Sequence, residues 1–182
     1  MKFILQTTNN IIQNQSVVLK IAIVDKIYKY GGARALVALH EQHMHSLLNT
    51  WRKAKAVGVH LSTTTDPDYE SMETLLRHTL RSSRGYITWI CEKLDLPDPG
   101  IDPVPELENV EREANVFLAH LLEKWQVPLC DIPEERFFDR VYTSRWDAEY
   151  CIEAMLEHAV MHPIRHEFQL INLMEAQKGS QK

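Results

Sequence analysis

The sequence predicts an all-α protein whose four long helices form a four-helix bundle. The chain has 182 residues but only 6 glycines and 8 prolines. Most of the prolines lie between Pro97 and Pro133, so long stretches on either side are nearly free of both residues. In these stretches apolar side chains recur every three or four residues, which is the period of an amphipathic helix. Four such segments joined by one or two lengthy connections are typical of a bundle.

The composition limits the class of protein. Hydrophobic residues make up 45% and charged residues 25% of the chain, a balance typical of one globular domain with a substantial core. The net charge of −5 gives no electrostatic reason to expect nucleic acid or an anionic membrane as a partner. Cys91, Cys130 and Cys151 lack CxxC spacing, which fits a reducing compartment. No signal-peptide core and no apolar run of membrane-spanning length occur, so we expect a cytoplasmic protein.

Residues 1–30 form an N-terminal arm whose structure the sequence leaves open. Residues 2–6 and 17–24 contain β-branched side chains, with an Asn/Gln-rich connection between them. A hairpin packed on the bundle, an added helix and a loose arm are all compatible with this pattern. Two successive glycines then mark a break. We place the bundle at residues 31–177, followed by a short tail at 178–182.

Residues 33–56 have the pattern of the first helix. Its apolar stripe follows three- and four-residue steps and includes Leu36, Leu39 and His43. Two lysines followed by Gly58 suit the C-terminus of this helix. We interpret His40 and His45 as parts of a polar flank, whereas His43 lies close enough to the stripe to join a site.

The second helix is predicted to end near residue 94. Asp66 or Asp68 can cap it, with a proline in its first turn. Its inward positions are Met72, Leu75, Thr79, Tyr86, Trp89 and Ile90. His78 belongs near the same face, two turns before Gly85. Small residues beneath a histidine leave room for a ligand or solvent, and equally Gly85 can let another helix approach closely.

A stiff connection leads to the third helix. Residues 96–105 contain four prolines and cannot be helical, so this segment could cross from one end of the bundle to the other. The third helix is predicted at residues 106–126, with an acidic start that the helix dipole favours. Its inward positions are Val110, Ala114, Phe117, Leu118, Leu121 and Trp125.

The fourth helix contains the histidines on which the functional prediction depends. It is predicted to extend to residue 177, with Thr143 or Ser144 as its N-cap and Asp147 in its first turn. The histidines that recur four residues apart on it are His158, His162 and His166. Residues at this spacing share one face of a helix, and the same face carries apolar residues. Imidazoles that point into an apolar interior need partners, because burying an unpaired polar group costs roughly 1–3 kcal/mol.

A divalent metal ion is one such partner. His162 and His166, at positions i and i+4, can bind one ion with the spacing found in helical zinc sites. His158 and His166 are about 12 Å apart along the helix axis, too far to share that ion. The third ligand must therefore come from another helix. His78 is the leading candidate because it faces inward, and His43 is the alternative.

Other kinds of site find less support. The sequence lacks the Glu-x-x-His pairs of di-iron bundles, the His-Glu-x-x-His motif, a glycine-rich phosphate loop and a Gly-x-Ser-x-Gly elbow. An apolar bundle core in which the histidines are merely hydrogen-bonded is the alternative to a metal site.

Two motifs on different helices carry a resemblance to a known family. They are Leu76-Arg-His78-Thr79 followed by Tyr86 and Trp89, and the His-x-x-x-His-x-x-Gln run from His162 to Gln169. Together these motifs resemble the DinB/YfiT-like metalloenzyme superfamily, over about residues 33–177.

The resemblance implies an up-down-down-up four-helix bundle with one divalent metal ion per chain, held by His78, His162 and His166. Zinc or nickel is the expected metal, with iron or manganese as alternatives, since imidazole suits several metals and availability decides among them. Members are frequently dimeric, and some transfer low-molecular-weight thiols. We therefore expect a homodimer and a metal-dependent thiol transferase or hydrolase that acts on a small-molecule substrate. A non-catalytic metal-binding or structural bundle is the alternative.

Several residues near the predicted ligands bear on this expectation. Phe168 stands where the family commonly has glycine, and we expect it to narrow the pocket or alter helix packing. Pro163 removes a backbone donor and should kink the last helix. Gln169 and Tyr86 are candidates for orienting ligands or substrate. His158 is a candidate partner of the ligands, a general base or a polar core residue, and we favour the core interpretation.

Overall fold

The computed structural model describes residues 27–61 and 65–179. Its four long helices are α1 (Gly31–Ala56), α2 (Met72–Lys93), α3 (Val110–Trp125) and α4 (Ile152–Gly179). Shorter elements are the 3-10 helices η1 (Pro67–Tyr69) and η2 (Glu134–Phe137) and the strands β1 (Tyr142–Thr143) and β2 (Glu149–Tyr150). The all-α prediction is therefore confirmed. Residues 1–26 of the predicted arm and 180–182 of the predicted tail lie outside the described residues.

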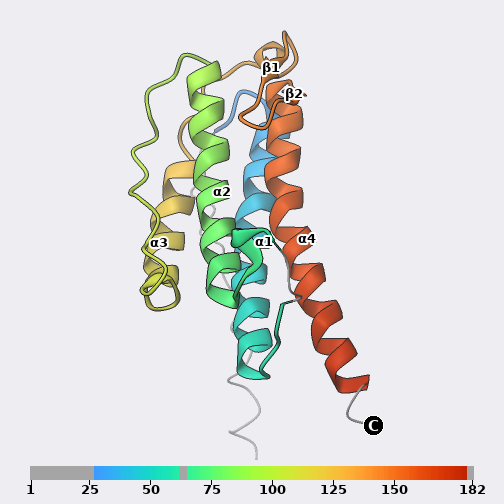
Figure 1. The fold of residues 1–182 in the computed structure, drawn as a ribbon. Coiled ribbons are helices and arrows are strands. Elements are labelled where there is room, and N and C mark those ends of the chain that lie inside the picture. Colours follow the sequence, from blue (N-terminus) through green and yellow to red (C-terminus); the bar gives the residue numbers. More distant parts are fainter. Residues whose placement is uncertain (1–26, 62–64, 180–182) are drawn as a thin grey trace, which may run out of the picture.

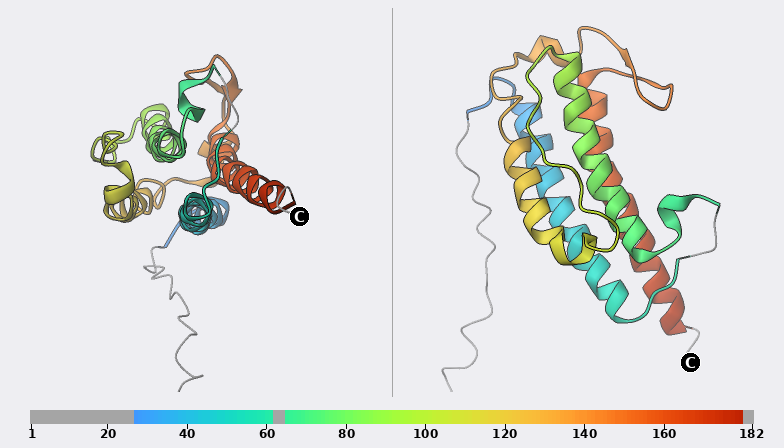
Figure 2. Two further views of the ribbon diagram at one scale, coloured as in Figure 1. Left: turned by 60° about the horizontal axis from the view of Figure 1, so that its bottom comes forward. Right: turned by 60° about the vertical axis from the view of Figure 1, so that its left-hand side comes forward.

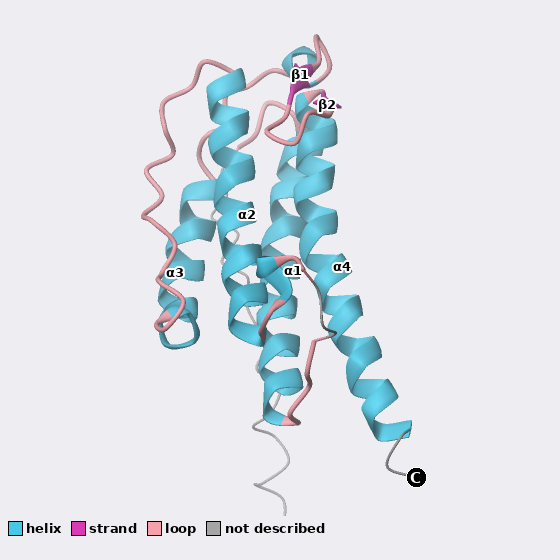
Figure 3. Cartoon of the chain, in the orientation of Figure 1, coloured by secondary structure: helices cyan, strands magenta, loops and turns pink. Residues whose placement is uncertain are grey.

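The four long helices lie side by side, with loops and the small hairpin at their ends (Figures 1 and 3). Helices α1 and α4 run in one direction and α2 and α3 in the other. Helix α1 packs along α4, and α2 packs against both α3 and α4. The proline-rich connection after α2 runs back along that helix to the start of α3 (Figure 2). This segment therefore crosses from end to end, as its prolines predicted.

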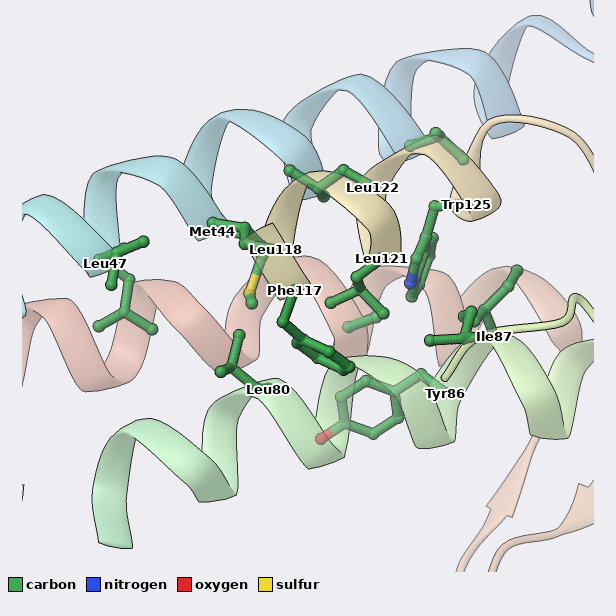
Figure 4. Packing of buried hydrophobic residues seen from close by; sticks show 14 of the residues in the cluster. Met44, Leu47, Leu80, Tyr86, Ile87, Phe117, Leu118, Leu121, Leu122 and Trp125 are labelled. Atoms are coloured by element: carbon green, nitrogen blue, oxygen red, sulfur yellow. The ribbon is translucent and has the colours of Figure 1, made fainter. Parts of the chain in front are cut away.

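Apolar side chains from all four long helices form one core. Figure 4 shows side chains of α1, α2 and α3 meeting between these helices. Every inward position predicted for the second and third helices is buried. Burial of apolar surface stabilises the folded chain by about 25 cal/mol per Å², so the periods of α2 and α3 fix which faces they bury. In the described part of the chain, no helix has the length and apolarity that a membrane span requires.

The apolar face predicted for α1 is displaced by about one residue from the face that is buried in the structure. Leu39 is 40% exposed, whereas His40 is only 1% exposed. The His40 ring stacks on Trp125 with 4.0 Å between ring centroids, and its Nε2 lies 3.0 Å from Ser83 Oγ. His40 is thus a core residue and not part of a polar flank, because two other helices supply its stacking and hydrogen-bonding partners.

Helix α2 begins at a capping box that the sequence interpretation missed. Ser71 Oγ accepts a hydrogen bond from Thr74 N at 3.0 Å, and Thr74 Oγ1 accepts one from Ser71 N at 2.9 Å. Asp66 instead caps η1, where its carboxylate accepts a hydrogen bond from Asp68 N at 2.9 Å. The prediction that Asp66 or Asp68 caps this long helix is therefore wrong, because the 3-10 helix intervenes. Asp68 is left available for the site described below.

Replacing Ser71 by alanine should destabilise the protein by about 1 kcal/mol, because a capping acceptor is lost at the start of α2. The free energy of unfolding measured in urea checks this expectation. Ser71→Asp is the matched control, since aspartate is also a good capping residue and should retain most of the stability. Equal losses in the two variants would contradict the capping role.

The segment before α4 is a β hairpin and not the first turns of a helix. Tyr142 pairs with Tyr150, and the turn is closed by a hydrogen bond from Ser144 N to Ala148 O of 2.8 Å. Asp147 has a φ of 59°, in the left-handed region that an α-helix excludes. The predicted cap at Thr143 or Ser144 is therefore wrong, and α4 begins at Ile152.

Pro163 lies inside α4, which continues past it to Gly179. Figure 1 shows the C-terminal part of α4 inclined away from its first part. A bend of this kind is the expected consequence of a missing backbone donor and a ring that clashes with the preceding turn.

Candidate metal centre

Helices α2 and α4 bring the three predicted ligands together. His78 comes from α2, and His162 and His166 come from successive turns of α4. The ligand atoms of these three residues all lie within 4.8 Å of one another, a cluster that could hold a metal ion. His43, the alternative third ligand, does not belong to the cluster.

The spacing of the imidazole nitrogens fits a single ion. His78 Nε2 lies 3.0 Å from His162 Nε2, and His166 Nε2 lies 3.4 Å from the same atom. Two nitrogens at about 2.0–2.1 Å from a tetrahedral zinc ion are about 3.3–3.4 Å apart. The distances between the imidazole nitrogens of the cluster are therefore close to those of a metal site.

The outer nitrogens of two of the rings lie next to oxygen atoms that can accept a hydrogen bond, an arrangement that favours a proton on each of these nitrogens. His78 Nδ1 lies 2.8 Å from Asp68 Oδ2, and His166 Nδ1 lies 3.4 Å from Gln169 Oε1. A proton on each Nδ1 leaves the lone pair of each Nε2 directed at the centre. A single proton on His162 Nε2 could satisfy only one of these two lone pairs. A shared cation would satisfy all three rings, so the donor set fits a metal better than a hydrogen-bonded cluster.

Burial keeps the central rings neutral. It lowers the pKa of His162 to about 2, with smaller contributions from neighbouring imidazoles and Arg165. Burial likewise lowers the pKa of His166 to about 4. Neutral imidazole is the form that coordinates a metal, so these two rings are in the binding form throughout the physiological pH range.

Asp68 supports the site from η1. This short helix starts at Pro67 and is capped by Asp66, which places the Asp68 carboxylate beside His78. The carboxylate also accepts hydrogen bonds from Arg81 Nη2 at 2.6 and 2.9 Å. A carboxylate that orients a coordinating histidine and raises its basicity is a recurrent partner of zinc ligands. The sequence interpretation missed this role, because Asp68 and His78 are ten residues apart and only the fold of η1 joins them.

Replacing Asp68 by asparagine should weaken metal affinity by about 10- to 100-fold, because the charged partner of His78 is lost. Competition with a chelating dye measures that affinity. Asp66→Asn is the matched control, since asparagine retains the capping of η1 and the carboxylate 2.8 Å from His78 Nδ1 is that of Asp68. An unchanged affinity in the Asp68 variant would remove the carboxylate from the site.

A cleft with a volume of about 560 Å³ opens beside the cluster. Its walls come from η1, α2, the turn of the β hairpin and α4, and Figure 1 shows these elements around the side where α2 and α4 lie next to each other. His78 and His162 line the cleft. Three ligands beside an open space are the arrangement of catalytic zinc sites, which keep one coordination position free.

Two of the three candidate auxiliary residues line this cleft. The rings of Tyr86 and His158 are 5.3 Å apart, and the Tyr86 ring is 5.6 Å from that of His162. Burial raises the pKa of Tyr86 to about 12 and lowers that of His158. His158 is half-buried at the cleft wall, so the core interpretation is wrong for it. Gln169 instead contacts His166.

Other residues of the cleft were missed from the sequence. Arg145 and Trp146 lie in the hairpin turn, which the sequence interpretation assigned to a helix. The Trp146 ring stacks on His158 at 5.5 Å with 27° between ring planes. Phe168 is 64% exposed and does not line the cleft. The expectation that it narrows the pocket is therefore wrong.

Fold and site together define an all-α protein with a three-histidine cluster that could hold a metal ion beside an open cleft. Neither a family model nor a curated protein nor a solved structure matches the chain.

Proposed function

We propose that this chain is a DinB-like, divalent-metal-binding protein and that the cleft is the active site of a metal-dependent transferase or hydrolase. The substrate is a small molecule, with low-molecular-weight thiols as the first class to test. The observation that carries the proposal is the convergence of the Nε2 atoms of His78, His162 and His166 beside an open cleft. The helix directions, with α1 and α4 opposite to α2 and α3, suit an up-down-down-up bundle.

The residues around the cluster suit metal-assisted chemistry. A divalent ion held by the three histidines would supply Lewis acidity and lower the pKa of a water or thiol at the site. Asp68 holds His78 with its Nε2 lone pair directed at the centre. Neutral ligands leave the full charge of the ion available to stabilise a developing anion.

The cleft also offers groups that can exchange protons with a substrate. His158 is neutral, since burial lowers its pKa, and one of its ring nitrogens can accept a proton. Tyr86 remains protonated, since burial raises its pKa to about 12, and its hydroxyl can donate a hydrogen bond. We assign His158 the role of general base and Tyr86 that of a donor to the substrate.

The test combines metal analysis with turnover assays on protein purified without chelator. We expect one divalent ion per chain and metal-dependent turnover within a panel of thiols paired with electrophiles, or of small esters and amides. His158→Ala and Tyr86→Phe should lower turnover while the metal content stays unchanged, because neither residue is a ligand. A metal-loaded protein inert toward the whole panel would favour the non-catalytic alternative. Protein without metal would contradict the proposed metal-dependent function and leave the structural bundle as the remaining interpretation.

A further inference from the structure

The cleft beside the three-histidine cluster has a charge opposite to that of the whole chain. The net charge of the chain is −5. The cleft is nevertheless lined by Arg81, Arg145 and Arg165, and none of the described residues in its lining is an aspartate or glutamate. A concave surface lined by charges of one sign concentrates small ions of the opposite sign. The cleft is therefore suited to an anion.

Two of these arginines have guanidinium groups that are available to bind a ligand. Arg81 is bound to the Asp68 carboxylate. Arg145 and Arg165 are exposed, and neither forms an ion pair with any carboxylate in residues 27–61 or 65–179. Glu92, whose pKa is lowered mainly by its hydrogen bond with Lys93 and more weakly by Arg145, is already bonded to that lysine.

Arg165 directs its charge into the cleft. It follows His162 by three residues on α4 and lines the same wall. Burial lowers the pKa of both His158 and His162, and the positive charge of Arg165 adds to each shift. An ion bound at the histidines would add further positive charge, and a bound anion would relieve the resulting repulsion.

An exposed aromatic ring stands next to these charges. Trp146 follows Arg145 in the hairpin turn and is 48% exposed. Its ring stacks on His158 and meets the Tyr86 ring nearly at right angles, with 6.3 Å between centroids. A large exposed ring at the mouth of a cleft offers its surface to an apolar or aromatic group. The volume of about 560 Å³ is that of a small-molecule site.

We propose that the cleft selects small molecules that carry an oxyanion, either a carboxylate or a phosphate, bound by Arg145 and Arg165, with an apolar or aromatic part against Trp146. The guanidinium groups can each donate paired hydrogen bonds to such an oxyanion. The proposal rests on the proposed function only in placing the reacting group of the same molecule at the three histidines.

The test is calorimetric binding of three probes of similar shape to the full chain after incubation with zinc: benzoate, phenyl phosphate and the neutral benzamide. At least one anionic probe should bind more tightly than benzamide, and added salt should weaken only the anions. Arg145→Gln and Arg165→Gln should each weaken anion binding about tenfold or more and leave benzamide unaffected. Trp146→Ala should weaken all three probes. Arg112→Gln, on the exposed face of α3, is the matched control.

Three outcomes would overturn the proposal: no binding of either anion, equal binding of anion and amide, or anion binding that both arginine variants retain in full. The third outcome would show that the metal alone holds the anion. The ratio between benzoate and phenyl phosphate identifies the preferred oxyanion. Metal content measured in the same samples separates the two proposals. Selective anion binding by protein without bound metal would contradict only the proposed function. Bound metal without selective anion binding would contradict only this inference.

Discussion

Replacing His162 by alanine is expected to abolish the metal binding that we propose for the three-histidine cluster. Its Nε2 is the atom that both other ligands approach, at 3.0 Å for His78 and 3.4 Å for His166. Loss of a partner that only orients a ligand already weakens metal affinity by about 10- to 100-fold. Loss of the central ligand itself should exceed that range. Metal analysis by mass spectrometry, on protein prepared without chelator, measures the effect.

Two further variants make this experiment decisive. His158→Ala removes an imidazole from the same helix, one turn before His162 and with 6.4 Å between their ring centroids. This control should retain one ion per chain. His162→Gln keeps most of the side-chain volume, so loss of metal there cannot be ascribed to a cavity in the core. One ion per chain in either His162 variant would refute the ligand assignment.

The second large effect is a loss of stability in acid that originates at His40. Its burial, together with the charge of His43, lowers the pKa of His40 to about 3 from the value of 6.5 expected for an exposed histidine. Between these two values the unfolded chain binds a proton that the folded chain does not. The contribution of His40 to the free energy of unfolding is therefore fully present above pH 6.5 and is lost progressively as the pH falls toward 3. The slope from this one residue approaches about 1.4 kcal/mol per pH unit.

Urea unfolding across this pH range, in the presence of a chelator, tests the expectation. His40→Gln retains a partner for Ser83 but does not titrate, so its unfolding free energy should vary less steeply with pH than that of the parent. His40→Leu should show the same flattening, whatever it does to stability at neutral pH. A slope that neither substitution changes would mean that His40 does not couple folding to pH.

The sequence by itself determined the helices and the pairing of two histidines on one helix face. The inward faces of α2 and α3 follow from apolar residues spaced three or four apart, because burial of one continuous stripe dominates the energetics of a helix. The pairing of His162 with His166, and the exclusion of His158, follow from the rise of 1.5 Å per residue along a helix. Both arguments use only distances within one helix, which the sequence fixes.

Only the tertiary structure decided which residues from different elements meet. Asp68 was interpreted as a cap because its partner His78 is reached only through the turn of η1. His40 was interpreted as surface because its partners lie on two other helices. The turn that carries Arg145 and Trp146 was interpreted as helix, since its pairing depends on backbone hydrogen bonds and a left-handed residue.

The three-histidine cluster likewise combines features set within single helices with features set by the packing between them. Periodicity placed the three histidines of α4 on one face and His78 on the inner face of α2, but it could not say that the two faces meet at one point. That meeting depends on the packing of α2 against α4, a property of side-chain shapes across the interface. The cleft and its arginines depend on the same packing. The spacing of His162 and His166 on one helix face was therefore predictable from the sequence, and the surroundings of the cluster were not, because each neighbour comes from a different part of the chain.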